Sequence, residues 1–142
     1  MKVRELMSKP VVRIHADEPV SVAARTLTHY NIGALPVCDR NGRVCGMLTD
    51  RDIVTRCLAA DRDQHRTKVS DVMTGQVQCI DADADVTLAA HVMGAKQLRR
   101  LPVLEHDRLC GVISLGDLAN SEPTAYDAAD ALSEITSNIS HR

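Results

Sequence analysis

The chain has 142 residues, with 17 Lys or Arg, 19 Asp or Glu and a formal net charge of −2. That length fits one globular unit or two fused halves, and the near-neutral charge gives no electrostatic case for binding nucleic acid. No apolar run reaches membrane-spanning length and the first residues lack a signal-peptide pattern, so a cytoplasmic protein without a membrane partner is expected.

The sequence pattern of the first half predicts the element order β-α-β-β-α. A short helix at 3–7 precedes a strand at 11–14 and an amphipathic helix at 19–27. Strands at 34–38 and 43–48 flank Asn41-Gly42, which is a strong signal for a two-residue hairpin. A helix at 50–60 follows, and its residues Ile53, Val54, Cys57 and Leu58 are expected to face inward.

The second half repeats this order. A short helix is predicted at 69–73, a strand at 77–80 and a helix from Val86 to Met93, and the hairpin turn is shorter, around His106-Asp107. A terminal helix at 126–135 carries an apolar stripe of Ala128, Ala131, Leu132 and Ile135. The expected fold class is α/β (of the α+β type), with helices against small mixed sheets.

An internal repeat explains this duplication. Met73 follows Met7 by 66 residues and Pro102 follows Pro36 by 66, whereas Gly111 follows Gly46 by 65. The one-residue deletion falls in a turn, where length changes are tolerated. The predicted domains are therefore 1–62 and 63–121, followed by a helical tail at 122–142; halves of this size are marginal alone, so a shared core is expected.

Each half contains the block Gly-x-x-(Ser/Thr)-x-x-Asp at the start of a helix. It runs from Gly46 through Thr49 to Asp52, and from Gly111 through Ser114 to Asp117. One interpretation is purely structural, because a hydroxyl and a carboxylate three residues later form a helix cap. The other adds a ligand, because a carboxylate can accept hydrogen bonds from a ribose diol and a hydroxyl can approach phosphate. The duplication favours the second interpretation.

These blocks, each after an apolar-Pro-Val strand and a hairpin, resemble the cystathionine-β-synthase (CBS) domain, and the tandem copies resemble a Bateman module. The resemblance covers about residues 3–120 and implies two tandem CBS units packed as a pseudo-two-fold pair. Residues 32–38 and 46–54 also resemble small stand-alone bacterial CBS-pair proteins of the hypoxic-response type. The family implies a regulatory module that binds AMP, ADP or ATP, or sometimes NAD or S-adenosylmethionine, in the cleft between the copies.

The resemblance implies two sites. In the first, Asp117 would bind ribose and Ser114, Arg99 and Arg100 would lie near phosphate. In the second, Asp52 would bind ribose, with Thr49 and Arg51 near phosphate. The adenine would lie against residues of the other copy: Val12 and Ile32 for the first site, Gln78 and Leu98 for the second.

The two sites differ in their cations. Gly33 and Ala34 stand where the second copy has its arginine pair, and Gly116 stands where the first copy has Arg51. Because two arginines chelate a polyphosphate better than one, the Asp117 site is expected to bind more tightly. For Arg99 and Arg100 a solvated surface pair is the alternative.

The remaining chemistry-bearing residues give weaker signals. Cys38 is expected opposite Cys45 across the hairpin, as an oxidation-sensitive pair or, more in keeping with a cytosolic protein, as two reduced thiols. The six histidines form no metal motif, and no nucleophile elbow, P-loop or Rossmann fingerprint occurs, so neither a metal site nor an enzyme is expected.

The sequence thus predicts a non-catalytic adenine-nucleotide module without an obligatory cofactor. A partner protein would sense the arrangement that the ligand favours, and a homodimer is expected through the helices at 50–60 and 115–120. The alternatives are a redox or stress-response protein without a physiological nucleotide, and a purely structural interaction module.

Overall fold

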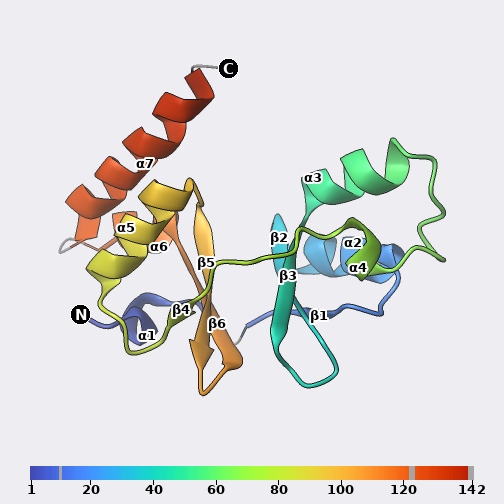
Figure 1. Cartoon of the computed structure of the whole chain (residues 1–142), viewed down its shortest axis with the longest axis horizontal. Helices are drawn as coiled ribbons and strands as arrows, with labels where there is room; N and C mark the ends of the chain where they lie inside the picture. The colour runs from blue at the N-terminus through green and yellow to red at the C-terminus, as the bar shows by residue number, and fades with distance from the viewer. Residues whose placement is uncertain (10, 122–123, 141–142) are drawn as a thin grey trace. The chain divides into compact units, whose positions relative to one another are not determined.

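The structure is a computed structural model that describes residues 1–9, 11–121 and 124–140 (Figure 1). It divides into two compact units. Residues 12–77 form the continuous unit, and residues 1–11 together with 78–142 form the two-segment unit. In the described ranges no helix has the length and apolar character needed to cross a bilayer.

The continuous unit is a three-stranded sheet with its helices. Its strand order is β1-β2-β3, with β1 parallel and β3 antiparallel to β2. In chain order the elements are β1 (Ile14–His15), α2 (Val20–Tyr30), β2 (Ala34–Cys38), β3 (Val44–Thr49), α3 (Asp50–Ile53), the π-helix η1 (Val54–Leu58) and α4 (Val69–Val72).

The two-segment unit repeats this plan with strand order β4-β5-β6 and the same pairing directions. Its elements are α1 (Val3–Leu6), β4 (Ile80–Asp81), α5 (Val86–Lys96), β5 (Arg100–Glu105), β6 (Arg108–Ser114), α6 (Leu115–Ala119) and α7 (Ala125–Ser140). Both units are mixed α/β, so the predicted fold class is confirmed. Each has its own core of aliphatic residues and methionine or cysteine.

The short helices α1 and α4 are exchanged between the two units. Helix α1 comes from the first repeat but belongs to the two-segment unit, and α4 comes from the second repeat but belongs to the continuous unit. In the two-segment unit, the Val3 amide donates to the Ala84 carbonyl at 2.9 Å. In the continuous unit, the Val69 amide donates to the Glu18 carbonyl at 2.8 Å. The predicted ranges 1–62 and 63–121 follow the repeat along the chain, whereas each compact unit takes its short helix from the other repeat.

The glycine of each repeated block makes room for this exchanged segment. At Gly111 an added Cβ would lie 3.0 Å from the Ser8 carbonyl oxygen and 2.6 Å from the Met7 sulfur. At Gly46 it would lie 2.9 Å from the Thr74 carbonyl oxygen and would overlap the Met73 sulfur. The backbone at Thr74 cannot move away from Gly46 without a loss of stability, because Thr74 and Met47 exchange two backbone hydrogen bonds of 2.9 Å.

Gly46→Ala is therefore expected to lower the free energy of unfolding by about 1–3 kcal/mol, the usual cost of overpacking. Urea unfolding of the native and variant chains would measure it. Gly75→Ala is the matched control, because a Cβ there meets nothing within 4 Å, and it should change stability by no more than about 0.5 kcal/mol. Equal effects at the two glycines would contradict the close-approach argument.

The shorter turn predicted around His106-Asp107 is confirmed, whereas the first hairpin differs from its prediction. The tight two-residue turn is His106-Asp107, where both residues have positive φ, at 51° and 62°. The predicted two-residue turn at Asn41-Gly42 is wrong, because β2 ends at Cys38 and only Gly42 has positive φ there. The Asp39 carboxylate closes this wider loop by accepting from the Asn41 and Arg43 amides.

Several predicted boundaries and faces also shift. The strands expected at 11–14 and 77–80 are shorter, as β1 and β4, and the other predicted helices and strands are present within a few residues. Val54 and Leu58, expected to face inward, are 53% and 59% exposed. They lie in η1, where π-helical winding replaces the 3.6-residue period on which the prediction rested. Leu132 is likewise exposed, although Ala128, Ala131 and Ile135 of the same predicted stripe are buried.

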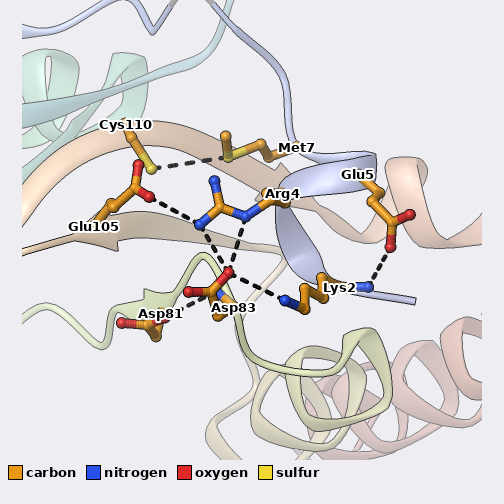
Figure 2. A network of polar contacts seen from close by, with 8 residues as sticks. All are labelled: Lys2, Arg4, Glu5, Met7, Asp81, Asp83, Glu105 and Cys110. Atoms are coloured by element: carbon orange, nitrogen blue, oxygen red, sulfur yellow. Dashed lines mark hydrogen bonds and ion pairs between the residues drawn. The ribbon is translucent and has the colours of Figure 1, made fainter.

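A network of charges attaches α1 to the rest of the two-segment unit (Figure 2). The Arg4 guanidinium donates to the Asp83 carboxylate at 2.8 and 2.9 Å and to the Glu105 carboxylate at 2.9 Å. The Lys2 ammonium lies 3.6 Å from the same Asp83 oxygen. Hydrogen bonds to Glu105 and Asp83 raise the pKa of Arg4, and the hydrogen bond from Arg4 lowers the pKa of Asp83 below its ordinary value of 3.8.

Asp83→Asn is expected to lower the melting temperature at pH 7, because it removes the charge that pairs with Arg4. A carboxyl with a lowered pKa stabilises the fold above its ordinary pKa and loses that effect as the pH falls through the lowered value. The gap in Tm between native and variant should therefore close on acidification below pH 3.8. Asp107→Asn in the exposed β5–β6 turn is the control; a gap for Asp83→Asn that does not depend on pH would contradict the ion-pair explanation.

Candidate functional site

The two repeated blocks form helix caps of the same geometry. The Asp52 amide donates to the Thr49 hydroxyl at 3.0 Å, and the Thr49 amide donates to Asp52 Oδ2 at 3.0 Å. In the second block, the Asp117 amide donates to the Ser114 hydroxyl at 3.0 Å, and the Ser114 amide to Asp117 Oδ2 at 2.8 Å. The capping interpretation is confirmed. It leaves one carboxylate oxygen, Oδ1, outside the cap in each block, so a cap and a ligand contact are compatible.

The two aspartates differ in their surroundings. Arg56, one helical turn after Asp52, places its Nε 3.9 Å from Asp52 Oδ1. Its other nitrogen, Nη1, is fixed by the carbonyl oxygens of Val72 and Met73 at 3.3 and 3.0 Å. The matching position after Asp117 is Ser121, which carries no charge. Asp52 is also buried, while Asp117 is half-buried, so Asp117 is the more available acceptor.

Arg99, Arg100 and Ser114 line one cavity of about 610 Å³ in the two-segment unit. Pairing of β5 with β6 sets Arg100 opposite Ser114. The Leu115 amide donates to the Arg99 carbonyl at 2.8 Å, which ties the start of α6 to the residue before β5. Both arginine side chains are exposed, and the structure records no ion pair for either within its described residues. Asp117 does not line the cavity but is hydrogen-bonded to Ser114, which does.

The corresponding position in the continuous unit has fewer cations. Asp50 at the start of α3 donates its amide to the Gly33 carbonyl at 3.1 Å, the counterpart of the Leu115–Arg99 bond. Because Gly33 has no side chain, the basic residues near the Thr49–Asp52 cap are Arg51, which is exposed, and Arg56, which is already paired with Asp52. The difference between the two caps among the described residues therefore lies in their arginines without an ion pair: Arg99 and Arg100 in the two-segment unit, and Arg51 in the continuous unit.

The four predicted adenine contacts stay predictions. Val12 and Ile32 belong to the continuous unit, and Gln78 and Leu98 belong to the two-segment unit. Val12 and Leu98 are half-buried against the cores of their own units, whereas Ile32 and Gln78 are exposed. Val12 and Ile32, predicted for the Asp117 site, and Gln78 and Leu98, predicted for the Asp52 site, thus each lie in the unit that does not contain that aspartate.

Sequence reasoning missed two contributors to these sites. Arg56 could have been found, because a cation four residues after a carboxylate on a helix is a recognised pair. The second is α7, whose residues Ala125, Ala128, Ala129 and Leu132 line the same cavity as Arg99 and Arg100. Its apolar stripe predicted burial in general and gave no signal for this location.

The cysteines give little support to redox chemistry. Cys38 pairs with Val44 rather than Cys45, because a bulge after Val37 shifts the register, so the predicted opposition of the two cysteines is wrong. All five cysteines are free thiols. Burial is the main cause that raises the pKa of Cys38, Cys45 and Cys110, which disfavours the thiolate that oxidation requires. Within the described residues, no three His, Cys, Asp or Glu side chains group as metal ligands.

The family model described as "CBS domain" matches residues 3–59 and 69–123. The chain belongs to the CBS-domain family. The two matched ranges correspond to the two copies of the repeat, and each contains one Gly-x-x-(Ser/Thr)-x-x-Asp block. The resemblance inferred from those blocks is therefore confirmed.

Relatives of similar length support this assignment. The uncharacterized protein YlbB of Bacillus subtilis is 37% identical over 136 residues, covering 95% of this chain and 91% of the relative. Hypoxic response protein 1 of Mycobacterium tuberculosis is 35% identical over 120 residues, 84% of each chain. The resemblance to CBS-pair proteins of the hypoxic-response type is thus also confirmed.

Solved structures agree with the fold. The crystal structure of Hypoxic Response Protein I with two coordinated zinc ions matches with a TM-score of 0.79 and 34% identity, covering 87% of this chain and all of that chain. The CBS-domain pair of protein MJ0100, in complex with 5′-methylthioadenosine and S-adenosyl-L-methionine, matches with a TM-score of 0.72 and 28% identity, covering 84% and 93%.

Proposed function

We propose that this CBS protein is a non-catalytic regulatory module that binds an adenine nucleotide of the AMP, ADP or ATP class. The observation that supports it best is the cavity lined by Arg99, Arg100 and Ser114. Two guanidinium groups that form no ion pair with any described residue suit a phosphate chain, which accepts charge-assisted hydrogen bonds from arginine. The complex of the MJ0100 CBS pair with two adenosine-containing ligands supports the nucleoside part of the proposal.

The cap geometry supports a role for Asp117 toward ribose. Its Oδ2 accepts from the Ser114 amide, and its Oδ1 is left to accept from a sugar diol. The Ser114 hydroxyl accepts from the Asp117 amide, so its own proton is available to a phosphate oxygen. Phosphate at the arginines and ribose at Asp117 would be linked through the same serine.

The second site is proposed to be weaker. Asp52 is buried and its free oxygen faces Arg56, so a ribose would have to compete with an internal cation. Arg51 would stand beside Thr49 in place of the arginine pair. The expected order of affinity is therefore the Asp117 site first and the Asp52 site second.

A homodimer is proposed through the helical surface of the continuous unit. Val54 and Leu58 on η1 are more than half exposed and would lose this exposure on pairing. The other predicted surface, at 115–120, is less suited, because α7 of the same chain packs against α6 and Leu118 is fully buried. The regulated partner would sense the ligand through a shift between conformations.

The test is thermal unfolding with AMP, ADP, ATP, NAD and S-adenosylmethionine. A ligand at 100 times its Kd stabilises the native state by about 2.7 kcal/mol. Asp117→Asn keeps an oxygen for the Ser114 amide while removing the charge, and it should reduce the stabilisation more than Asp52→Asn, its counterpart in the other unit. The proposal fails if none of the five compounds raises the Tm of the native chain.

A further inference from the structure

The cavity at Arg99 and Arg100 has a second wall. Its polar lining consists of these arginines and Ser114, and its apolar lining includes Ala128, Ala129 and Leu132 of α7, besides Ala125, Leu115 and Ala119. Helix α7 lies along α5 and α6 of the same unit (Figure 1). Ala128, Ala131 and Ile135 are the buried anchors of this packing, whereas Ala129 and Leu132 remain exposed beside them. One flank of α7 is thus buried and the adjacent flank borders the cavity.

The charges of α7 are arranged in a way that suits an anion. The helix carries Asp127, Asp130 and Glu134, and none of them lines the cavity. The Glu134 carboxylate lies instead beside Gly94 of α5, where an added Cβ would be 3.0 Å from it. The lining that α7 supplies is therefore uncharged, and its described side chains form no ion pair with the two arginines that line the same cavity.

Among the side chains of α7 whose burial the structure describes, up to residue 137, the buried anchors are mostly small. Two of the three, Ala128 and Ala131, are alanines, whose burial removes little apolar surface from water. Segments held by few buried apolar contacts open at a lower free energy than the rest of a fold. A ligand that contacts both walls of the cavity would lose part of its contacts whenever α7 leaves, so it must favour the packed position of α7.

We propose that α7 completes the nucleotide-phosphate pocket of the Asp117 site and that ligand binding and α7 packing stabilise each other. This inference rests on the proposed function. Because such coupling is reciprocal, the ligand tightens α7 as much as packed α7 tightens the ligand. Helix α7 is then the segment through which occupancy of the pocket is reported to a partner protein.

The first experiment places a negative charge in the cavity from the side of α7. Ala129→Glu is expected to weaken ATP binding at least about tenfold by calorimetry, because the new carboxylate faces the arginines that would bind phosphate. Ser133→Glu is the matched control: it is also exposed on α7, brings the same charge and does not line the cavity. It should change the Kd less than about twofold. Circular dichroism and Tm would establish that both variants fold.

The second experiment measures hydrogen exchange of the α7 amides with and without ATP. Exchange in α7 should slow on ATP binding in the native chain and should not change in the Arg99→Ala/Arg100→Ala variant. If native chain binds ATP through the arginines but Ala129→Glu binds like Ser133→Glu and α7 exchange stays the same, the inference is overturned while the proposed function stands. If the native chain binds neither ATP nor the other four compounds, both are overturned.

Discussion

The double variant Arg99→Ala/Arg100→Ala is expected to bind ATP about 10- to 100-fold more weakly than the native chain. Hydrogen bonds to a charged group contribute about 1.5–3 kcal/mol, and each 1.4 kcal/mol is a factor of ten in Kd. We take the lower range for the pair as a whole, because both side chains are exposed and solvent screens their charge. Isothermal titration calorimetry at fixed ionic strength would measure the change.

Two comparisons make this expectation specific. Arg108→Ala removes an exposed arginine of the same unit that does not line the cavity, and it should leave the Kd nearly unchanged. AMP should lose less affinity than ATP in the double variant, because it has fewer phosphate groups to engage the arginines. An equal loss of ATP affinity in Arg108→Ala would mean that the effect comes from the overall charge of the protein. An unaltered Kd in the double variant would show that Arg99 and Arg100 do not belong to the site.

The largest effect on stability is expected at Leu101. Its side chain is fully buried in β5, and it pairs across the sheet with Ile113, which is also fully buried. Because the chain has no Phe or Trp, aliphatic side chains of this kind supply the core. Leu101→Ala should lower the free energy of unfolding by about 2–5 kcal/mol, through lost burial and the cavity that remains. Equilibrium urea unfolding would measure it.

Leu35→Ala is the corresponding change in the continuous unit. Leu35 is fully buried and pairs with the fully buried Leu48 of β3, so a loss of similar size is expected there. Leu88→Ala on α5 is the control, because Leu88 is 48% exposed and truncation on the surface costs little. A loss at Leu101 no larger than that at Leu88 would contradict the assignment of the core.

The repeat made much of the fold predictable. Once Met7 aligned with Met73 and Pro36 with Pro102, each element in one half had a counterpart in the other, and the two sheets have matching strand orders. The capping function of Thr49 with Asp52 and of Ser114 with Asp117 was also predictable, because a cap depends only on neighbours within one turn.

Register and winding were less predictable. The bulge after Val37 sets Cys38 opposite Val44, and an extra residue of this kind changes every pairing beyond it. The π-helical turn at η1 leaves Val54 and Leu58 exposed although a regular helical period placed them inward. Both features depend on how the whole strand or helix meets its neighbours, which a local pattern does not encode.

The sequence by itself determined the duplicated α/β plan, the two caps and the unequal distribution of arginines, because these follow from residue types at fixed spacing. Only the tertiary structure decided which unit each short helix completes, that the carbonyls of Val72 and Met73 hold Arg56 beside Asp52, and that α7 borders the cavity of Arg99 and Arg100. The exchange of the short helices explains why glycine stands at 46 and 111. The position of Arg56 explains why Asp52 is less available to a ligand than Asp117. Each of these three features depends on contacts between segments that lie far apart in the chain. Such contacts are determined by how the whole unit packs.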